Sequence, residues 1–78
     1  MEVDIDCVNF QKKTGLFCAC ENNSFESAKL LIENNADINK PNHLLETPLH
    51  IACKKNFFKI AELLITNGAN VNAVSVYV

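Results

Sequence analysis

The chain has 78 residues, enough for one small domain, and a net charge of −2 at pH 7. A chain of this size buries only roughly 60% of the surface that its unfolded form exposes, so a closed globular core would be marginal. The slightly acidic balance excludes the positive field that would hold nucleic acid or an anionic membrane, and a content of 49% hydrophobic residues argues against disorder.

The N-terminal segment is acidic, with Glu2, Asp4 and Asp6 close to Met1. A secretory signal would instead begin with basic residues and continue with an apolar run. No apolar run approaches the ~20 residues that a membrane-spanning helix needs. The sequence therefore predicts an intracellular protein, cytoplasmic or nuclear, with no signal peptide and no membrane insertion.

The chain is predicted to form four short helices separated by connecting segments. A first pair of helices is expected over residues 15–21 and 25–33, and a second pair over residues 48–54 and 58–66. The connecting segments are expected to form extended turns that project from the helices; they cover residues 4–13 and 37–46.

The start of the second pair carries the clearest local signals. Thr47 is a good N-cap, because its hydroxyl can accept from an unpaired amide of the first turn, and Pro48 sits at the first helical position, where a missing N–H costs nothing. Leu49 and Ala52 lie three apart on one face. After the second helix, Gly68 can take the left-handed conformation that ends a helix.

The last predicted helix has a wide apolar stripe. Ile60, Ala61, Leu64 and Ile65 share one side, and Leu63 widens it. This pattern predicts a helix that is buried on most sides, like an inner member of a stack.

The two helix pairs are copies of one unit. When Thr14 is placed on Thr47, nearly half of the segment from Thr14 to Lys40 is identical to the segment from Thr47 to Ala73, without a gap. Most of the identical residues are small or apolar, as a unit that packs on its own copy requires. The shift divides the chain into a partial tail at 1–13, a repeat with its connecting loop at 14–46, a repeat at 47–73 and the truncated start of another loop at 74–78.

These features resemble the ankyrin-repeat family, whose signature is a period of about 33 residues with T-P-L-H-x-A ahead of a second helix. The shift from Thr14 to Thr47 has this length. The residues that match the structural motif are Thr47, Pro48, Leu49, His50, Ala52 and Gly68. The resemblance implies an all-α solenoid of helix-turn-helix pairs with projecting β-hairpin-like loops. It also implies a protein-binding role, no catalytic site and no cofactor.

Several departures from the family pattern carry expectations. Asn23, Asn35 and Asn56 stand where the family has glycine, and asparagine is the next-best residue at positive φ. Lys12 and Leu45 also replace glycine, which argues against a tight hairpin because bulky residues at positive φ are costly.

The family's binding surface consists of the loop tips and the concave face of the first helices. Carried over by position, the expected partner-binding residues are Phe10, Gln11, Lys13, Glu21, Asn22, His43, Leu44, Glu46, Lys54 and Lys55. Many of these positions differ between the two units, whereas the packing positions agree. By the same comparison, Phe58 matches Phe25 and is expected in the core, while Phe57 is expected to be an exposed anchor.

The ends of the chain are expected to be uncapped. Terminal repeats normally have polar outer faces, but Ile60, Leu64 and Ile65 are expected to lack a following partner. About three units are usually needed for stability. We therefore expect marginal stability, self-association through the uncapped ends, or membership of a longer array.

The polar and sulfur-containing residues are interpreted as structural. Cys18, Cys20 and Cys53 occupy helical positions that favour small apolar residues and are expected to be buried thiols; a metal site formed by them with His50 is disfavoured because no C-x-x-C pair is present. Thr47 and His50 are expected to fasten their own turn rather than to catalyse a reaction.

Two other roles stay open beside protein binding. The units could act as a structural spacer in a longer ankyrin-repeat protein whose activity lies elsewhere. In addition, Asn39 and Asn72 resemble positions that are hydroxylated in some ankyrin loops.

Overall fold

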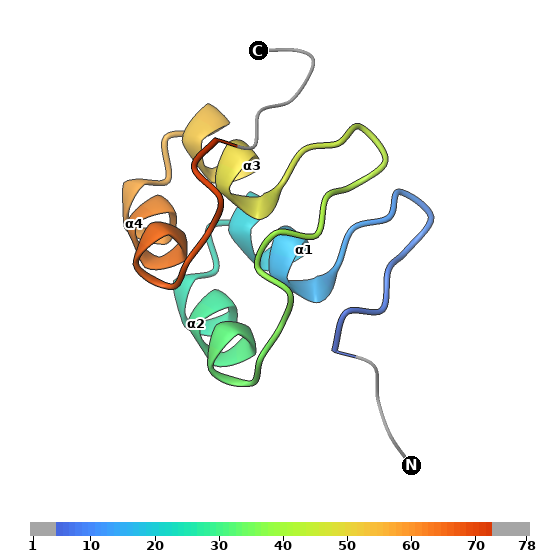
Figure 1. Cartoon of the computed structure of the whole chain (residues 1–78), viewed down its shortest axis with the longest axis horizontal. Coiled ribbons are helices and arrows are strands. Elements are labelled where there is room, and N and C mark those ends of the chain that lie inside the picture. The colour runs from blue at the N-terminus through green and yellow to red at the C-terminus, as the bar shows by residue number, and fades with distance from the viewer. Residues whose placement is uncertain (1–4, 73–78) are drawn as a thin grey trace.

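In the computed structural model, residues 5–72 are described and form four helices and no strand (Figure 1). The helices are α1 (Gly15–Glu21), α2 (Phe25–Glu33), α3 (Pro48–Lys54) and α4 (Phe58–Thr66). These bounds confirm the four helices that the sequence predicts. The expected loop start at residues 74–78 and the first residues of the N-terminal tail lie outside the described part.

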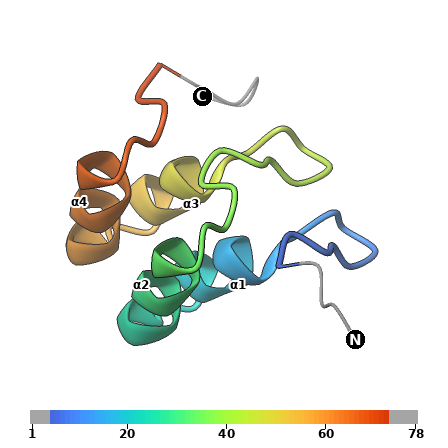
Figure 2. The same ribbon diagram turned by 60° about the horizontal axis from the view of Figure 1, so that its bottom comes forward.

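The four helices stack as two antiparallel pairs. α1 packs on α2 within the first pair and α3 packs on α4 within the second, while α1 contacts α3 and α2 contacts α4 between the pairs. The result is two layers, one of α1 with α3 and one of α2 with α4 (Figure 2). The two connecting loops project side by side from the α1–α3 layer, which sets them apart from the helical body.

Threonine hydroxyls begin the first helix of each pair. The Oγ1 atom of Thr14 accepts from the amide of Phe17 at 3.0 Å, and that of Thr47 accepts from the amide of His50 at 3.2 Å. Pro48 occupies the first position of α3, as predicted. Because both threonines are buried, these hydrogen bonds satisfy donors that water cannot easily reach.

All four helices end in the same Schellman motif. The amide two residues beyond the C-cap donates back into the helix, as Ser24 does to the carbonyl of Ala19 at 2.8 Å and Ala69 does to that of Leu64 at 2.9 Å. The residue before each such donor has positive φ, and these residues are Asn23, Asn35, Asn56 and Gly68. The three asparagines therefore replace glycine as expected.

Lys12 and Leu45 also adopt positive φ, at 59° and 64°. The expectation that these residues argue against tight loop geometry was wrong, because both loops close despite them. A side chain in this left-handed region costs roughly 1–2 kcal/mol per residue compared with glycine. The two loops therefore keep their shape at an energetic cost that glycine would avoid.

The core lies between the two pairs. Leu16, Phe17 and Cys20 from α1 are almost completely buried, and so are Ile60 and Leu64 from α4. The expectation that Ile60 and Leu64 lack a partner was wrong, because both point into the core that the first pair completes. Ile65 alone among the three expected residues is exposed, at 50%.

The second pair has an apolar outer side, which we call the C-terminal face: Cys53, Phe58, Ile65 and Val71. Cys53 is exposed although its counterpart Cys20 is fully buried. Phe58 is 77% exposed, whereas Phe25, its counterpart, is partly buried against the core. Within residues 5–72 no third pair covers this face, so residues that stacking buries in the first unit stay open in the second.

Three side-chain expectations therefore need correction. Phe58 is exposed rather than in the core, and Phe57 is partly buried against the core rather than an exposed anchor. Cys53 is exposed and Cys18 only half-buried, so among the three helical cysteines only Cys20 is a buried thiol. Burial raises the pKa of the Cys20 thiol to about 12, which makes it a poor nucleophile at neutral pH.

α4 is also less enclosed than its sequence predicts. Only Ile60 and Leu64 are fully buried in it, while Ala61 and Leu63 are half-buried. The helix covers the first pair with one side and leaves the other side open, as a terminal helix does.

The exposed C-terminal face leads to a prediction about association. We expect the isolated chain to unfold near room temperature as a dilute monomer and to associate as its concentration rises. Replacing Phe58 and Ile65 by lysine should lower this association, because it removes apolar area from the face without touching the core. Analytical ultracentrifugation over a range of concentrations measures the effect, with Glu62→Lys, at an exposed position of α4 outside this face, as the control. A strict monomer with a cooperative melt far above room temperature would contradict the prediction.

Candidate functional site: the projecting loops and the α1–α3 layer

Each projecting loop is organised by one asparagine side chain. The Oδ1 atom of Asn9 accepts from the amides of Gln11 and Lys13 at 2.9 and 3.0 Å. The Oδ1 atom of Asn42 accepts from the amides of Leu44 and Glu46, both at 3.0 Å. Such bonds from a side chain to backbone two and four residues ahead hold a turn in one shape.

Sequence reasoning missed Asn9 and Asn42 as organising residues. The signal was present, because the shift that places Thr14 on Thr47 also places Asn9 on Asn42. This identity lies outside the segment from Thr14 to Lys40 that was compared with its copy. The two asparagines lie five residues before Thr14 and Thr47.

The two loops are tied to each other near their tips. The amide of His43 donates to the carbonyl of Gln11 at 3.0 Å, and the Nδ1 atom of the same histidine lies 3.0 Å from that carbonyl. The second contact is a hydrogen bond when Nδ1 carries a proton. This tie joins residues 32 apart in sequence and gives the two tips a fixed relative position.

An ion pair joins the base of each loop to the end of the following helix, with its charges reversed between the units. In the first unit the Lys13 ammonium lies 2.9 Å from the Glu21 carboxylate. In the second, Glu46 occupies the lysine position and Lys54 the glutamate position, with 3.4 Å between the charged atoms. The charges are exchanged between the two units, but in each unit the two side chains still attract each other.

The residue between the two charges differs as well. In the first unit the Lys13 ammonium lies 5.8 Å from the centre of the Phe17 ring, a cation–π distance. In the second unit His50 replaces that phenylalanine, and its Nε2 atom lies 3.6 Å from the Glu46 carboxylate. A cation is thus placed over an aromatic ring in one unit, and a carboxylate beside an imidazole in the other.

Glu46 is the most buried charged residue of the site, at 5% exposure. Burial alone would raise the pKa of its carboxyl group. A hydrogen bond from the Asn42 side chain at 3.0 Å and the positive charge of Lys54 outweigh burial, so the pKa of Glu46 lies below its ordinary value. Glu46 is therefore charged at neutral pH and fastens its loop to α3.

The structure divides the expected partner-binding residues into two groups. The exposed group presents side chains to solvent from the loop tips and helix ends; it contains Phe10, Gln11, Asn22, His43, Leu44, Lys54 and Lys55. The other group, Lys13, Glu21 and Glu46, is at least partly buried and bonded within its own unit. The first group is accessible to a partner although Lys54 and His43 also make bonds within the chain, whereas the second group mainly shapes the surface.

A second set of hydrogen bonds crosses between successive segments below the loops. The Asp6 carboxylate accepts from the amide of Asp37, and the Asn39 side chain accepts from the amide of Asn70, each at 2.8 Å. Asn39 is one of the two asparagines noted for possible hydroxylation, and its side-chain oxygen is occupied here. Asn72, the other one, is exposed and donates its amide to the Asn70 side chain at 3.0 Å.

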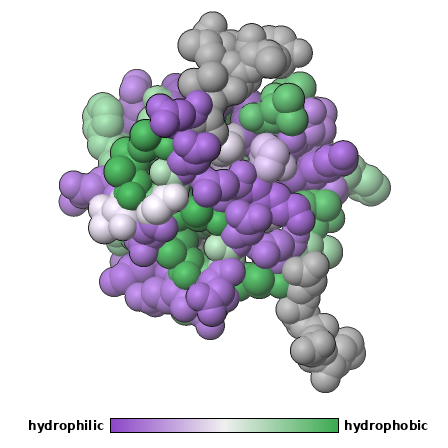
Figure 3. Space-filling view, in the orientation of Figure 1, coloured by the Kyte–Doolittle hydropathy of each residue, from purple (hydrophilic) through white to green (hydrophobic). Residues whose placement is uncertain are grey.

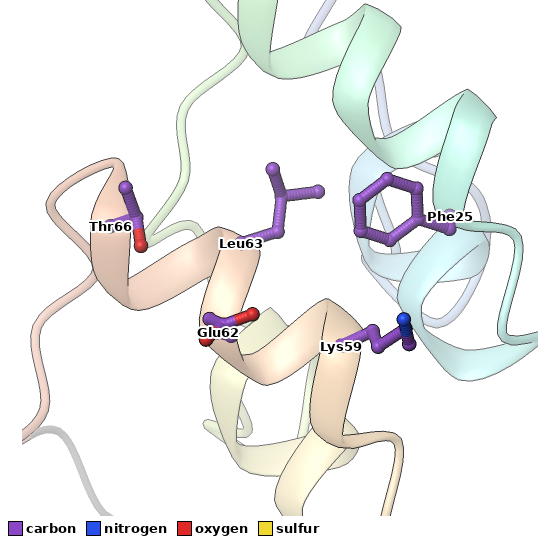
Figure 4. A pocket seen from close by; sticks show the side chains of 5 residues that line it. All are labelled: Phe25, Lys59, Glu62, Leu63 and Thr66. Carbon is purple, nitrogen blue, oxygen red and sulfur yellow. The ribbon is translucent and has the colours of Figure 1, made fainter.

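Two of the surface hollows among residues 5–72 bear on ligand binding. The first, of about 200 Å³, lies between α2 and α4, where the ring of Phe25 faces Leu63 and the polar residues Lys59, Glu62 and Thr66 follow α4 (Figure 4). It is smaller than the roughly 300–1,000 Å³ of typical ligand pockets. The second, of about 450 Å³, lies between the two projecting loops and falls within that range.

A metal site would need a group of ligating side chains, and membrane insertion would need a long apolar helix. Among the residues that the structure describes, no three His, Cys, Asp or Glu side chains are grouped so that they could share a metal ion. None of the described helices is long and apolar enough to cross a membrane.

Comparison with known proteins decides the family. A model of ankyrin repeats in three copies matches residues 1–75. The chain belongs to the ankyrin-repeat family. No curated protein matches it. Ankyrin repeats are generally protein–protein interaction modules and are typically not enzymes, and the all-α stack of helix pairs described above is their fold.

The lowered pKa of Glu46 leads to a prediction about the pH dependence of stability. A carboxyl group whose pKa is lower in the folded state contributes stability above its unfolded value, near 4.5 here, and loses this contribution as the pH falls toward the folded value. Replacing Glu46 by Gln should therefore lower the free energy of unfolding by about 1 kcal/mol at pH 7. The difference from wild type should shrink below pH 4.5. Urea unfolding from pH 7 to pH 3 measures it, and a difference that is constant with pH would contradict the assignment.

The reversed ion pairs lead to a double-mutant prediction. Lys13→Glu and Glu21→Lys should each lower the free energy of unfolding, because each places two like charges together. The double variant should recover about 0.5 kcal/mol relative to the sum of the single effects, as partly exposed ion pairs do. The recovery should be incomplete, since the cation over Phe17 is lost. Purely additive effects at low salt would show that the pair contributes nothing.

Proposed function

We propose that this ankyrin-repeat chain is a non-catalytic interaction module that binds a partner protein through the tips of its two loops and the concave α1–α3 layer. The observation that supports it is that the two loops share one backbone conformation but carry different side chains at their tips. Two loops of the same shape, tied through His43 and Gln11, carry Phe10 at one tip and Leu44 near the other. The backbone conformation repeats, and the exposed side chains do not.

Phe10 is the strongest single feature of this surface. Its side chain is fully exposed at a loop tip, where it contributes nothing to the core. Aromatic side chains are enriched among the residues that dominate binding energy at interfaces, because they bury a large area with little loss of rotamer freedom. A rigid loop that holds an aromatic ring in solvent suits contact with a partner.

The rest of the surface agrees with a protein partner. In the view of Figure 3, hydrophobic side chains form separate patches between hydrophilic ones instead of one continuous apolar area. Interfaces of non-obligate complexes have this mixed character. The net charge of −2 gives no support to a nucleic-acid partner.

A structural spacer is the alternative role. It would need the two end faces but not the loop tips, because spacer units contact only their neighbours in the array. The exposed Phe10 favours the binding role over this one.

Photo-crosslinking tests the proposal and separates the two roles. A photoreactive phenylalanine analogue placed at Phe10 or at Leu44 should crosslink to a protein of the native host. The same analogue at Leu30, an exposed residue on α2 away from the loops, instead reports contacts made by the open end of the helical stack. The protein identified by crosslinking can then be captured without a crosslinker. Replacing Phe10 and Leu44 together by alanine should lower this non-covalent capture by about tenfold or more, a typical loss for interface anchors.

The outcome that contradicts the proposal is equally clear. Crosslinks that form at position 30 and not at positions 10 or 44 would place the contact on the helical body. That result would favour the spacer, and crosslinks at none of these positions, in chain shown to be folded by circular dichroism, would likewise contradict binding through the loop tips.

A further inference from the structure

The groove between the two loops is lined by both apolar and positively charged side chains, which the packing of the repeats does not require. Its walls include Val8 and Lys12 from the first loop and Lys40, Pro41, His43 and Leu45 from the second, and its volume is about 450 Å³. Val8 and Leu45 are exposed, at 38% and 60%. Apolar surface and ammonium groups therefore face one open space.

We propose that this groove binds an acidic peptide segment that carries an apolar side chain beside its carboxylates. The proposal rests on the proposed function and specifies the chemistry of the partner. It is carried by three independent observations: the backbone conformation of two lining residues, the charges in the lining, and the rigidity of the loops that form the walls.

The backbone conformation points to a role for two particular side chains. Lys12 and Leu45 occupy equivalent positions in the two loops, both have positive φ, and both line the groove. Glycine would adopt this conformation without strain. Strain that persists in a structure often marks a functional position, and the contribution of these two side chains beyond glycine is to line the groove.

The charges in the lining select the partner. Lys12 and Lys40 supply two ammonium groups, and among the described residues no carboxylate lines the groove. Lys40 donates to the carbonyl of Asp6 at 3.3 Å, whereas Lys12 has no ion-pair partner within residues 5–72. A carboxylate of a partner would give Lys12 the charge-assisted hydrogen bond that residues 5–72 do not provide.

The apolar residues favour a peptide over other anions. Val8, Pro41 and Leu45 offer a surface that a leucine-like side chain can cover, whereas a phosphate backbone would leave it unused. Two lysines on a chain with a net charge of −2 also give little of the counterion release on which nucleic-acid binding depends.

The walls of the groove are held in shape by hydrogen bonds of the chain itself. Asn9 and Asn42 fix the turn of each loop, and the bond from His43 to the Gln11 carbonyl holds the loops together. A preformed site loses little conformational entropy on binding, which favours even a small ligand.

Selection from a random peptide library displayed on phage, with the whole 78-residue chain as bait, tests the inference. Enriched peptides should carry aspartate or glutamate next to an apolar residue. The affinity of the best peptide, measured by fluorescence anisotropy, should fall about tenfold or more in Lys12→Gly, because a hydrogen bond between charged groups is lost. It should fall in Leu45→Gly as well.

The same variants carry an internal control for folding. Glycine at position 12 or 45 removes backbone strain, so each variant should unfold at a higher urea concentration than wild type while it binds more weakly. Asn56→Gly is the matched control, since Asn56 also has positive φ but does not line the groove. It should raise stability and leave peptide affinity unchanged.

Several results would overturn the inference. They are the absence of acidic enrichment, binding that Lys12→Gly and Leu45→Gly leave unchanged, and preferential binding of a single-stranded RNA oligonucleotide or of phosphatidylserine vesicles over the selected peptides. Crosslinks from Phe10 or Leu44 that persist in the two glycine variants, combined with any of these results, would leave the interaction module standing and remove only the acidic peptide from the groove.

Discussion

The fold depends on packing between two helix pairs that cannot bury their apolar surface separately. Cys20 is fully buried because the second pair covers it, and its counterpart Cys53, which has no such cover within residues 5–72, is exposed. Ile60 and Leu64 are buried in the same interface from the other side. Burial in a repeat protein is therefore a property of the neighbour as much as of the residue.

This interface also fixes the loops, and through them the surface that can contact a partner. The second half of each loop is held by hydrogen bonds to its own asparagine, and its base is fastened by an ion pair to the first helix of the pair. Because α1 and α3 pack side by side, their loops must run together, and the bond between His43 and Gln11 follows. The groove is thus a consequence of stacking, while its charge is a property of the individual loop residues.

The local signals in the sequence were sufficient for the helices but not for the environment of each side chain. Thr47, Pro48 and Gly68 act on backbone groups within a few residues, so helix bounds could be predicted from them. Phe58 and Cys53 were misplaced because identity with Phe25 and Cys20 carries no information about whether a third pair follows. Glu46 was expected to face a partner, since the differences between the repeats do not reveal that the Glu46 and Lys54 side chains contact each other. The strain at Lys12 and Leu45 could be anticipated from glycine positions, whereas the hollow between them requires both loops in space.

The single interface between the pairs has a consequence for cooperativity. In a long solenoid an end unit can fray while the remaining units keep their own interfaces. Within residues 5–72, opening either pair exposes the residues that both contribute to one shared core, including Leu16 and Leu64. Neither pair is a subdomain that can persist while the other is open. Amide protons of α1 and α4, far apart in sequence, are therefore protected by the same opening event and should give the same free energy of opening from their exchange with solvent.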